Sequence, residues 1–426
     1  MTPTTGTTET SGTTETAGAA GAAGPGLVHT RRARFGPAAE LRRLSEGRPV
    51  TRIDVGPGTD GMPVWLVTGH AEVRQVLGDH RRFSTRRRFG PRAAGSSAPS
   101  AGKGEGPRPD ELIGQLMDYD PPEHTRLRGI LTPEFTLRRM RRIEPGITGI
   151  VTEHLDAMER TGPPADLITA FASPVPGAAL CELIGIPRDD RGDFLRRCHA
   201  FLAPGRGRQR RAAAGESLSR YVAAMVARQR TDPDDGFVGM LVRDHGDAVT
   251  DKELRGVCVL LVLAGLDNVS GMLGLGTLLL LGHPDQLAAV RDDPGAVDGA
   301  VEELLRHLSV PHAPTPRTAL ADVTVGGQLI RAGEHVLCSL PMANRDPALL
   351  ADPDRFDITR EPGAHLAFGH GIHHCLGAAL ARMELRIAYP ALLRRFPGLR
   401  LAVPDDEVPF RVHALAHGVK RLPVTW

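Results

Sequence analysis

Residues 368–377 read FGHGIHHCLG and place three histidines and one cysteine within ten positions. These side chains are common ligands of transition metals. His373, His374 and Cys375 are adjacent, so their side chains diverge and cannot all converge on one ion. A structural zinc site needs four ligands, normally from two separated pairs, and the chain offers no second pair. The stretch therefore indicates a metal centre that uses few of these four side chains.

A porphyrin changes the ligand requirement. Haem supplies four equatorial nitrogens, so the protein need add only one axial ligand. Gly369, Gly371 and Gly377 are consistent with this, because glycine lets the backbone approach a flat ring and aim N–H groups at a sulfur atom. A single thiolate ligand under haem is therefore the interpretation that accounts for both the cysteine and the glycines.

The same ten residues resemble the haem-binding signature of the cytochrome P450 family, F-G-x-G-x-[HR]-x-C-x-G, and the resemblance continues along nearly the whole chain after residue 26. It implies haem b as the cofactor and Cys375 as the metal ligand, with Phe368, Gly369 and Gly377 beside the ring. It also implies a mainly α fold with a small β portion. In that fold one large domain holds the haem between a long central helix and the loop that carries the cysteine ligand.

Residues 120–136, DPPEHTRLRGILTPEFT, resemble the family's helix with the pattern H-x-x-x-R. His124 and Arg128 would lie one helical turn apart on one face. Haem carries two propionates that must be neutralised if they are buried. The resemblance implies that four residues bind them: His124, Arg128, Arg317 and His373.

The other histidines near the signature receive different roles. His370 and His374 are expected at the surface or behind the ligand, without touching iron. His365 also stands at a family position, and we expect it to serve in packing.

Residues 257–281, VCVLLVLAGLDNVSGMLGLGTLLLL, are long and apolar enough to cross a bilayer. Asp267 lies near the middle, where a charge costs roughly 2.5–3.5 kcal/mol on insertion scales. We therefore expect a helix buried on all sides at the centre of a large domain, and no association with a membrane.

Within this helix, AGLDNVSG (264–271) matches the family's oxygen-activating segment, A-G-x-[DE]-T. The resemblance implies that Ala264 and Gly265 lie against the ring and that Asp267 is the catalytic acid. Asn268 stands where the family usually has threonine. An amide donates and accepts hydrogen bonds but relays a proton less readily than a hydroxyl.

Three readings of Asn268 follow. It can hold a water molecule or the substrate in a working monooxygenase, which is the reading we favour. It can alter proton delivery in a way that suits a coupling reaction. It can also be a neutral substitution.

Two motifs resemble the family's buried charge cluster. EELLR contains Glu303 and Arg306, and DPDRFD supplies Arg355 as the expected third member. The resemblance implies that these residues hold the core on the haem side together.

A coordinated thiolate favours cleavage of the O–O bond. The expected activity is a haem-thiolate monooxygenase that uses O2 to hydroxylate or epoxidise a small organic molecule in specialised metabolism. One alternative is oxidative coupling or ring formation without oxygen insertion. Another is a haem protein that binds or senses without turnover.

Electrons must come from other proteins, because the chain lacks a G-x-G-x-x-G strand–helix unit and a cysteine cluster. By analogy with the family, the donors are a ferredoxin and its reductase. We expect the ferredoxin to dock on the face nearest Cys375, where basic residues attract an acidic protein. The candidates are Arg138, Arg139, Arg141, Arg142, Arg394 and Arg395.

The 426 residues carry a net charge of +2, which does not suggest a nucleic-acid partner. The five cysteines are odd in number and scattered along the chain, which favours a reducing compartment, the cytoplasm. Residues 1–26 lack the apolar side chains needed to fold, so we expect a disordered tail there and a haem domain at 27–426.

Helical patterns dominate the sequence. Thr250 and Glu253 have capping-box spacing at the start of the central helix. Further helices are expected at 294–308 and 377–396, with a kink or a break at Pro390. Strands are expected at 65–69, 322–340 and 412–426, and long loops at 85–110 and 203–214.

Overall fold

The computed structural model describes residues 32–45, 47–54, 63–86, 114–203, 207–311, 315–361, 363–411 and 416–426. The tail expected at 1–26 and most of the loop expected at 85–110 lie outside these residues. The expected mainly α fold with a small β portion is confirmed.

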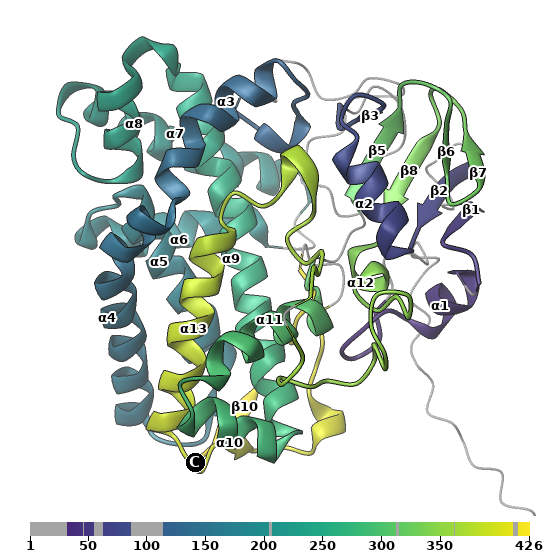
Figure 1. Ribbon diagram of the computed structural model, residues 1–426. Helices are drawn as coiled ribbons and strands as arrows, with labels where there is room; N and C mark the ends of the chain where they lie inside the picture. Colours follow the sequence, from purple (N-terminus) through teal and green to yellow (C-terminus); the bar gives the residue numbers. More distant parts are fainter. Residues whose placement is uncertain are drawn as a thin grey trace, which may run out of the picture.

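Helices form most of the described chain. They are α1 (Ala39–Ser45), α2 (His70–Gly78), α3 (Glu123–Leu131), α4 (Leu137–Thr161), α5 (Pro174–Ile184), α6 (Arg188–Leu202), α7 (Arg208–Thr231), α8 (Phe237–His245), α9 (Asp251–Leu281), α10 (Pro284–Asp292), α11 (Ala296–Leu308), α12 (Leu340–Ala343) and α13 (Ala378–Arg395). Helices α3 to α11 and α13 pack together, while α1, α2 and α12 lie with the largest sheet (Figure 1).

Helix α9 is the central helix. Its expected capping box is confirmed, since the Glu253 N–H donates to Thr250 Oγ1 (3.2 Å) and the Thr250 N–H donates to Glu253 Oε2 (2.9 Å). The half from Val269 to Leu280 is buried, against α5, α7 and α13 among others. Among the described helices, only α9 is by itself long and apolar enough to cross a membrane, and half of its most apolar stretch is buried inside the protein.

The β portion is small. Its strands are β1 (Val50–Asp54), β2 (Pro63–Val67), β3 (Phe83–Ser84), β4 (Ala165–Asp166), β5 (Thr315–Ala319), β6 (Val323–Val325), β7 (Gln328–Ile330), β8 (His335–Cys338), β9 (Arg400–Leu401) and β10 (Pro423–Thr425). The largest sheet has the order β1-β2-β8-β5-β3, in which only the β2–β8 pair is parallel.

The strand predictions are confirmed in two regions. Residues 65–67 belong to β2, and 322–340 contain β6, β7 and β8. Gly326 and Gly327 make the β6–β7 turn at φ values of +52° and +76°, which favour glycine. Within 412–426 the described strand is only β10, because the chain before it makes isolated bridges to Pro311 and Phe410.

Two helix predictions need correction. The loop expected at 203–214 is shorter, because α7 already begins at Arg208. Helix α13 continues through Pro390 without ending there. Pro390 is buried in a helix that packs against α4, α9, α10 and α11, so tertiary contacts outweigh the local cost of the missing N–H.

The expected charge cluster contains a different third member. Arg306 binds both oxygens of Glu303 at 2.7 and 2.8 Å, and both side chains are buried. The prediction of Arg355 is wrong: its side chain is 67% exposed and lies 3.3 Å from Asp357. Arg360 instead brings its Nε within 3.6 Å of Glu303 Oε1, because the turn after Asp357 reverses the chain toward α11.

Candidate functional site

The loop that carries Cys375 ends directly at the N-terminus of α13. Gly369 and Gly371 both have φ of +73°, a left-handed conformation that strains other residues. A Cβ at Gly371 would also collide with the Leu77 carbonyl. The Cys375 N–H donates to the Phe368 carbonyl (2.9 Å), which closes the loop into a compact turn. The backbone therefore holds the Cys375 thiol in one place.

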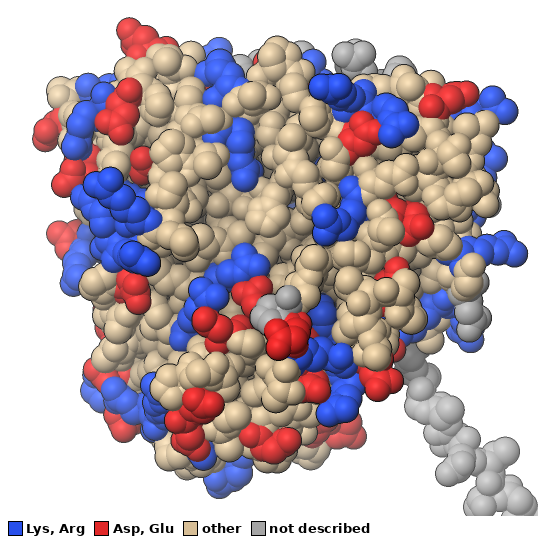
Figure 2. Space-filling view, viewed as in Figure 1, with Lys and Arg blue, Asp and Glu red and all other residues tan. Residues whose placement is uncertain are grey.

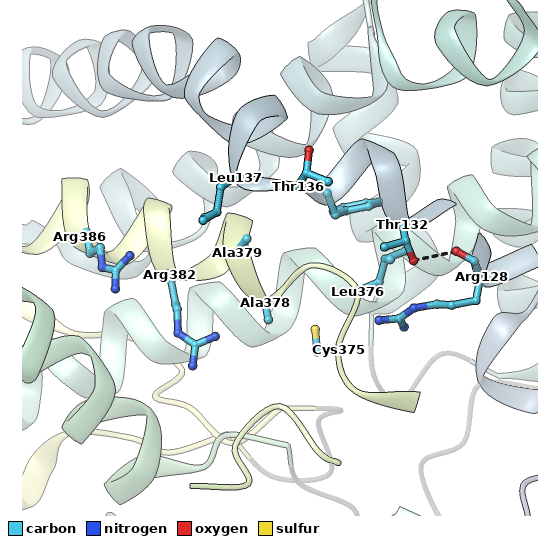
Figure 3. A pocket seen from close by; sticks show the side chains of 11 residues that line it. Arg128, Thr132, Thr136, Leu137, Cys375, Leu376, Ala378, Ala379, Arg382 and Arg386 are labelled. Atoms are coloured by element: carbon cyan, nitrogen blue, oxygen red, sulfur yellow. Dashed lines mark hydrogen bonds between the residues drawn. The ribbon is translucent and has the colours of Figure 1, made fainter. Parts of the chain in front are cut away.

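Burial raises the pKa of the Cys375 thiol, and three groups oppose this effect. They are the Gly377 N–H, which hydrogen-bonds to the sulfur, and the charges of Arg128 and Arg382. Figure 3 shows Cys375 at the end of its loop with the Arg128 and Arg382 guanidiniums on either side of it. All three groups would stabilise a thiolate.

Cys375 lines a cavity of about 370 Å³ between the α3–α4 corner and the start of α13 (Figure 3). The lining residues are Arg128, Thr132, Phe135, Thr136, Leu137, Cys375, Leu376, Ala378, Ala379, Arg382 and Arg386. None of them belongs to α9. This cavity is therefore an outer pocket on the Cys375 side and is distinct from the space beside the central helix.

Two histidines next to this loop, the buried His124 and the half-buried His373, each have a buried ring nitrogen without a hydrogen-bond partner among the described residues. The Nε2 atoms of His124 and His373 are both unpartnered among the described residues, and the ring centroids lie 4.3 Å apart. Arg317 is buried as well, and its one described side-chain bond is to the neighbouring Pro316 carbonyl.

Electrostatics show that these groups and Arg128 lie close together. Burial, together with the charges of Arg317, His124 and Arg128, lowers the pKa of His373 to about 3, and the charge of Asp120 partly opposes them. Burial and the Arg128 charge lower the pKa of His124. The structure thus brings together all four residues expected at the propionates, as a basic cluster with buried, unpaired nitrogen donors. That arrangement fits a pair of carboxylates.

The middle of α9 carries an uncovered strip. Ala264 is exposed in the described structure, and Leu260 and Asn268, four residues to each side, are half-buried. A Cβ at Gly265 would meet only Leu180, at an ordinary distance of 3.7 Å, whereas one at Gly271 would lie 2.6 Å from the His417 carbonyl. Packing within the protein therefore requires glycine at 271 but not at 265. The open strip is where a flat ring and a substrate would lie.

The expected acid Asp267 is held by a residue that the sequence did not indicate. Arg411 donates from Nη1 to Asp267 Oδ1 (3.0 Å) and from Nη2 to Ser270 Oγ (3.3 Å), and its Nε donates to the Val419 carbonyl (3.2 Å). The C-terminal segment is thus tied to the centre of α9. No local pattern could reveal this, because 144 residues separate Arg411 from Asp267.

Asn268 folds back onto its own helix. Its Nδ2 donates to the Ala264 carbonyl at 2.8 Å. This contact occupies one amide hydrogen and leaves the carbonyl oxygen and the second hydrogen available beside the open strip. Asn268 therefore still has both a donor and an acceptor there.

His365 does more than the packing expected of it. Its Nε2 lies 3.0 Å from Glu302 Oε2, and the Ala367 N–H donates to its Nδ1 (3.2 Å). Glu302 also receives two bonds from Arg382. His370 is half-buried and His374 is exposed, which agrees with the expectation that neither contacts the metal.

The basic residues expected to face a ferredoxin do not form one surface. Arg139 is buried and donates to the Asp235 carbonyl (2.6 Å). Arg394 lies near the far end of α13, roughly 24 Å from its start at a rise of about 1.5 Å per residue. Arg395 lies beyond it and pairs with acids of α4. On the face in front in Figure 2, basic side chains border a tan hollow and are mixed with acidic ones.

Close to Cys375 the described surface is basic and apolar. Arg382, Arg386 and Leu137 line the outer pocket, and Leu137 is 70% exposed. Arg138 follows Leu137 and is exposed. A surface of this kind suits a partner with acidic groups around an apolar centre.

Comparison with known proteins gives consistent matches. The family described as Cytochrome P450 matches residues 204–414. Cytochrome P450 165B3 of Amycolatopsis orientalis is 54% identical over 94% of this chain and 99% of its own length.

Solved structures agree with this result. The P450 StaH from biosynthesis of the glycopeptide antibiotic A47934 is 60% identical, with a TM-score of 0.85 over 94% of this chain and all of that one. OxyC, a cytochrome P450 implicated in an oxidative C–C coupling reaction during vancomycin biosynthesis, is 47% identical, with a TM-score of 0.83 over 93% and 96% of the two chains.

Proposed function

The chain belongs to the cytochrome P450 family, and we propose that it is a haem-thiolate monooxygenase that oxidises a small organic molecule of specialised metabolism with O2. The observation that supports this most is the setting of Cys375. One cysteine, held by a glycine-rich loop and flanked by two arginines, lies near a basic cluster with unpaired buried nitrogens. These residues fit a thiolate ligand and the propionates of haem.

Haem with a thiolate ligand supplies an iron atom that favours cleavage of the O–O bond. Cys375 would be the ligand, and Gly377 would donate to its sulfur. Phe368 and Gly369 on one side and Ala264 and Gly265 on the other would enclose the ring. The propionates would be held by the four residues of the basic cluster: His124, Arg128, Arg317 and His373.

Protons would reach the site through the middle of α9. Asp267 is the acid in this proposal, and Arg411 holds one of its oxygens. Asn268 would bind a water molecule or the substrate with the amide groups that its bond to Ala264 leaves available. Together these residues would order water in the space beside the open strip of α9.

Replacing Asn268 tests this role. We expect Asn268→Ala to lower the product formed per NADPH by about tenfold, less than the ~10²–10⁴-fold typical of a direct acid–base group, because water can replace part of its function. Hydrogen peroxide release should rise correspondingly. Asn268→Thr should stay near the parent, because a threonine hydroxyl can also bond the carbonyl four residues earlier. Equal coupling and peroxide release in Asn268→Ala and the parent would exclude the role.

The electrons would come from a ferredoxin and its reductase, with the ferredoxin docking around the outer pocket beside Cys375. Support comes from the exposed Leu137 and from the basic side chains of Arg138, Arg382 and Arg386. Long-range attraction between opposite charges speeds association and weakens as salt screens it.

Charge reversal at Arg138 tests this docking site. We expect Arg138→Glu to slow reduction by ferredoxin by about tenfold at low salt, since a rim charge acts mainly on the association rate. The matched control is Arg394→Glu, an exposed arginine near the other end of α13, which should leave the rate unchanged. Rates indifferent to salt, or equal effects of the two variants, would exclude docking at this surface.

A second candidate function is oxidative coupling, in which the substrate loses two hydrogen atoms and gains no oxygen. Two observations favour it: the similarity to OxyC and the amide of Asn268 at the usual threonine position. The similarity to StaH makes peptide precursors of glycopeptide antibiotics the first substrate class to test.

Spectroscopy and product mass distinguish these possibilities. Candidate peptides and other small aromatic molecules are titrated into the haem-loaded protein while the Soret band is followed. Those that shift the band are then incubated with ferredoxin, reductase and NADPH. A product heavier by one oxygen atom supports monooxygenation, and one lighter by two hydrogen atoms supports coupling. Binding without any product would exclude both.

We further propose that residues 27–426 form one haem domain and that the protein works in the cytoplasm. The five cysteines are free thiols, four of them buried, which is compatible with a reducing compartment.

A further inference from the structure

We propose that Glu302, Arg382 and His365 form a brace behind the Cys375 loop that sets the reduction potential of the iron bound there. This inference rests on the proposed function, because it requires haem on Cys375. The three side chains come from α11, α13 and the segment just before the signature. They would act through Cys375 and Phe368 and would not touch the substrate.

The first link joins the two helices. Arg382 binds Glu302 in bidentate geometry, with Nε to Oε1 at 2.7 Å and Nη2 to Oε2 at 2.8 Å. The Arg382 guanidinium also lies 4.6 Å from the ring centroid of Phe368, in a cation–π contact. The Arg382 guanidinium is therefore held along its edge by Glu302 and on its face by the Phe368 ring. A fixed charge acts on its surroundings more strongly than one that moves through solvent.

The second link joins Glu302 to the signature loop. The Ala367 N–H can only donate, so His365 Nδ1 is the acceptor and the ring proton lies on Nε2. Nε2 then donates to Glu302 Oε2 at 3.0 Å. His365 is thus held in one orientation by two hydrogen bonds. It fastens the loop to the same carboxylate that holds Arg382.

These links close on the cysteine. Residues 365–368 are consecutive, and the carbonyl of Phe368 accepts the Cys375 N–H (2.9 Å). The Asn344 side chain accepts from the Leu366 N–H (2.6 Å) and holds the same segment from behind. A shift of Glu302 or Arg382 would therefore be transmitted to Phe368 and Cys375.

The brace also sets the charge beside the sulfur. Burial by itself would raise the pKa of Glu302, but the hydrogen bonds from Arg382 and His365 lower it to about 2, so the carboxylate is ionised at neutral pH. Arg382 lines the same outer pocket as Cys375 (Figure 3), and Glu302, which is bonded to the Arg382 guanidinium, offsets its charge. One added electron on the iron is stabilised by the cation and destabilised by the anion. The two residues therefore act on the potential in opposite directions.

This opposition makes the proposal testable. Arg382→Gln should lower the midpoint potential, and Glu302→Gln, which leaves the positive charge unbalanced, should raise it. We expect each shift to correspond to about tenfold in the reduction equilibrium, or about 59 mV for one electron. The side chain of Arg382 is 26% exposed, so water screens part of its charge. Arg382→Lys should restore most of the potential.

The matched control is Arg386→Gln. Arg386 lines the same outer pocket one turn further along α13, but it pairs with Asp298 (2.7 Å) and is 3.9 Å from Glu302. We expect the Arg386→Gln variant to have the same midpoint potential as the parent protein. Potentials are measured by dithionite titration of the haem-loaded protein with mediators and without ferredoxin, so that docking plays no part.

The outcomes separate the two proposals. The brace is supported if the midpoint potential falls in Arg382→Gln, rises in Glu302→Gln and stays unchanged in Arg386→Gln. Shifts of both variants in the same direction, or no shift of Arg382→Gln relative to Arg386→Gln, overturn it. Because Arg382 is partly exposed, we expect Arg382→Gln to fold and to bind haem. Its midpoint potential therefore tests the brace even if Glu302→Gln yields no haem-loaded protein. A parent that lacks the thiolate–carbon monoxide band would overturn the proposed function itself.

Discussion

Replacing Cys375 with histidine is expected to remove the red-shifted absorption band that reduced, thiolate-ligated haem gives with carbon monoxide. A histidine ligand lacks the electron density that a thiolate donates to the iron. Turnover should fall at least about 100-fold, beyond the ~10–100-fold typical of residues that only support a ligand. The measurement is the difference spectrum with carbon monoxide, followed by product formation.

Cys258→Ala is the matched control for this prediction. Burial raises the pKa of the Cys258 thiol to about 12, so this residue stays a neutral thiol inside α9. Its variant should keep the thiolate band. Retention of the band in Cys375→His would show that another residue supplies the ligand.

Replacing Glu303 with alanine is expected to destabilise the protein by roughly 3–5 kcal/mol, because it leaves the buried charge of Arg306 without its partner. Glu303 also accepts the Asp357 N–H at 3.0 Å, so the same change frees the turn that carries Arg360. We expect little soluble, haem-loaded protein. Urea unfolding of whatever folds, together with its haem content, measures the effect.

Two arginine variants show which residues belong to this cluster. Arg355→Ala should change stability by no more than about 0.5 kcal/mol, as is usual for an exposed side chain. Arg360→Ala should cost more, because Arg360 also binds the carbonyls of Ala351 (2.9 Å) and Asp352 (2.7 Å). Normal stability and haem content in Glu303→Ala would contradict a structural role for the cluster.

Local spacing made much of the fold and site predictable. The α9 capping box follows from the spacing of Thr250 and Glu253. The Glu303–Arg306 ion pair follows from the spacing of three positions along one helix. Gly369 and Gly371 can adopt their positive φ values because glycine has no side chain. Each feature depends on residues a few positions apart, whose geometry is set by helix periodicity or backbone sterics.

Other predictions depended on which segments meet. Arg355 and Arg360 both follow α11 in sequence, and only the turn after Asp357 decides which of them approaches Glu303. A kink or an end of the helix was expected at Pro390, and the helix does not end there, because α13 is held by four neighbouring helices. Local sequence propensity could predict neither the approach of Arg360 to Glu303 nor the packing of other helices around Pro390.

The sequence by itself determined the family, the cysteine ligand that we propose and the central helix, since a short signature and a helical period carry that information within the chain. Only the tertiary structure decided which distant residues form hydrogen bonds that hold the site in place. Arg411 reaches Asp267 across 144 positions, and Glu302 joins Arg382 and His365 across 80 and 63. Such pairs form only when packed helices and loops bring distant side chains within hydrogen-bonding distance, and no local pattern encodes that distance.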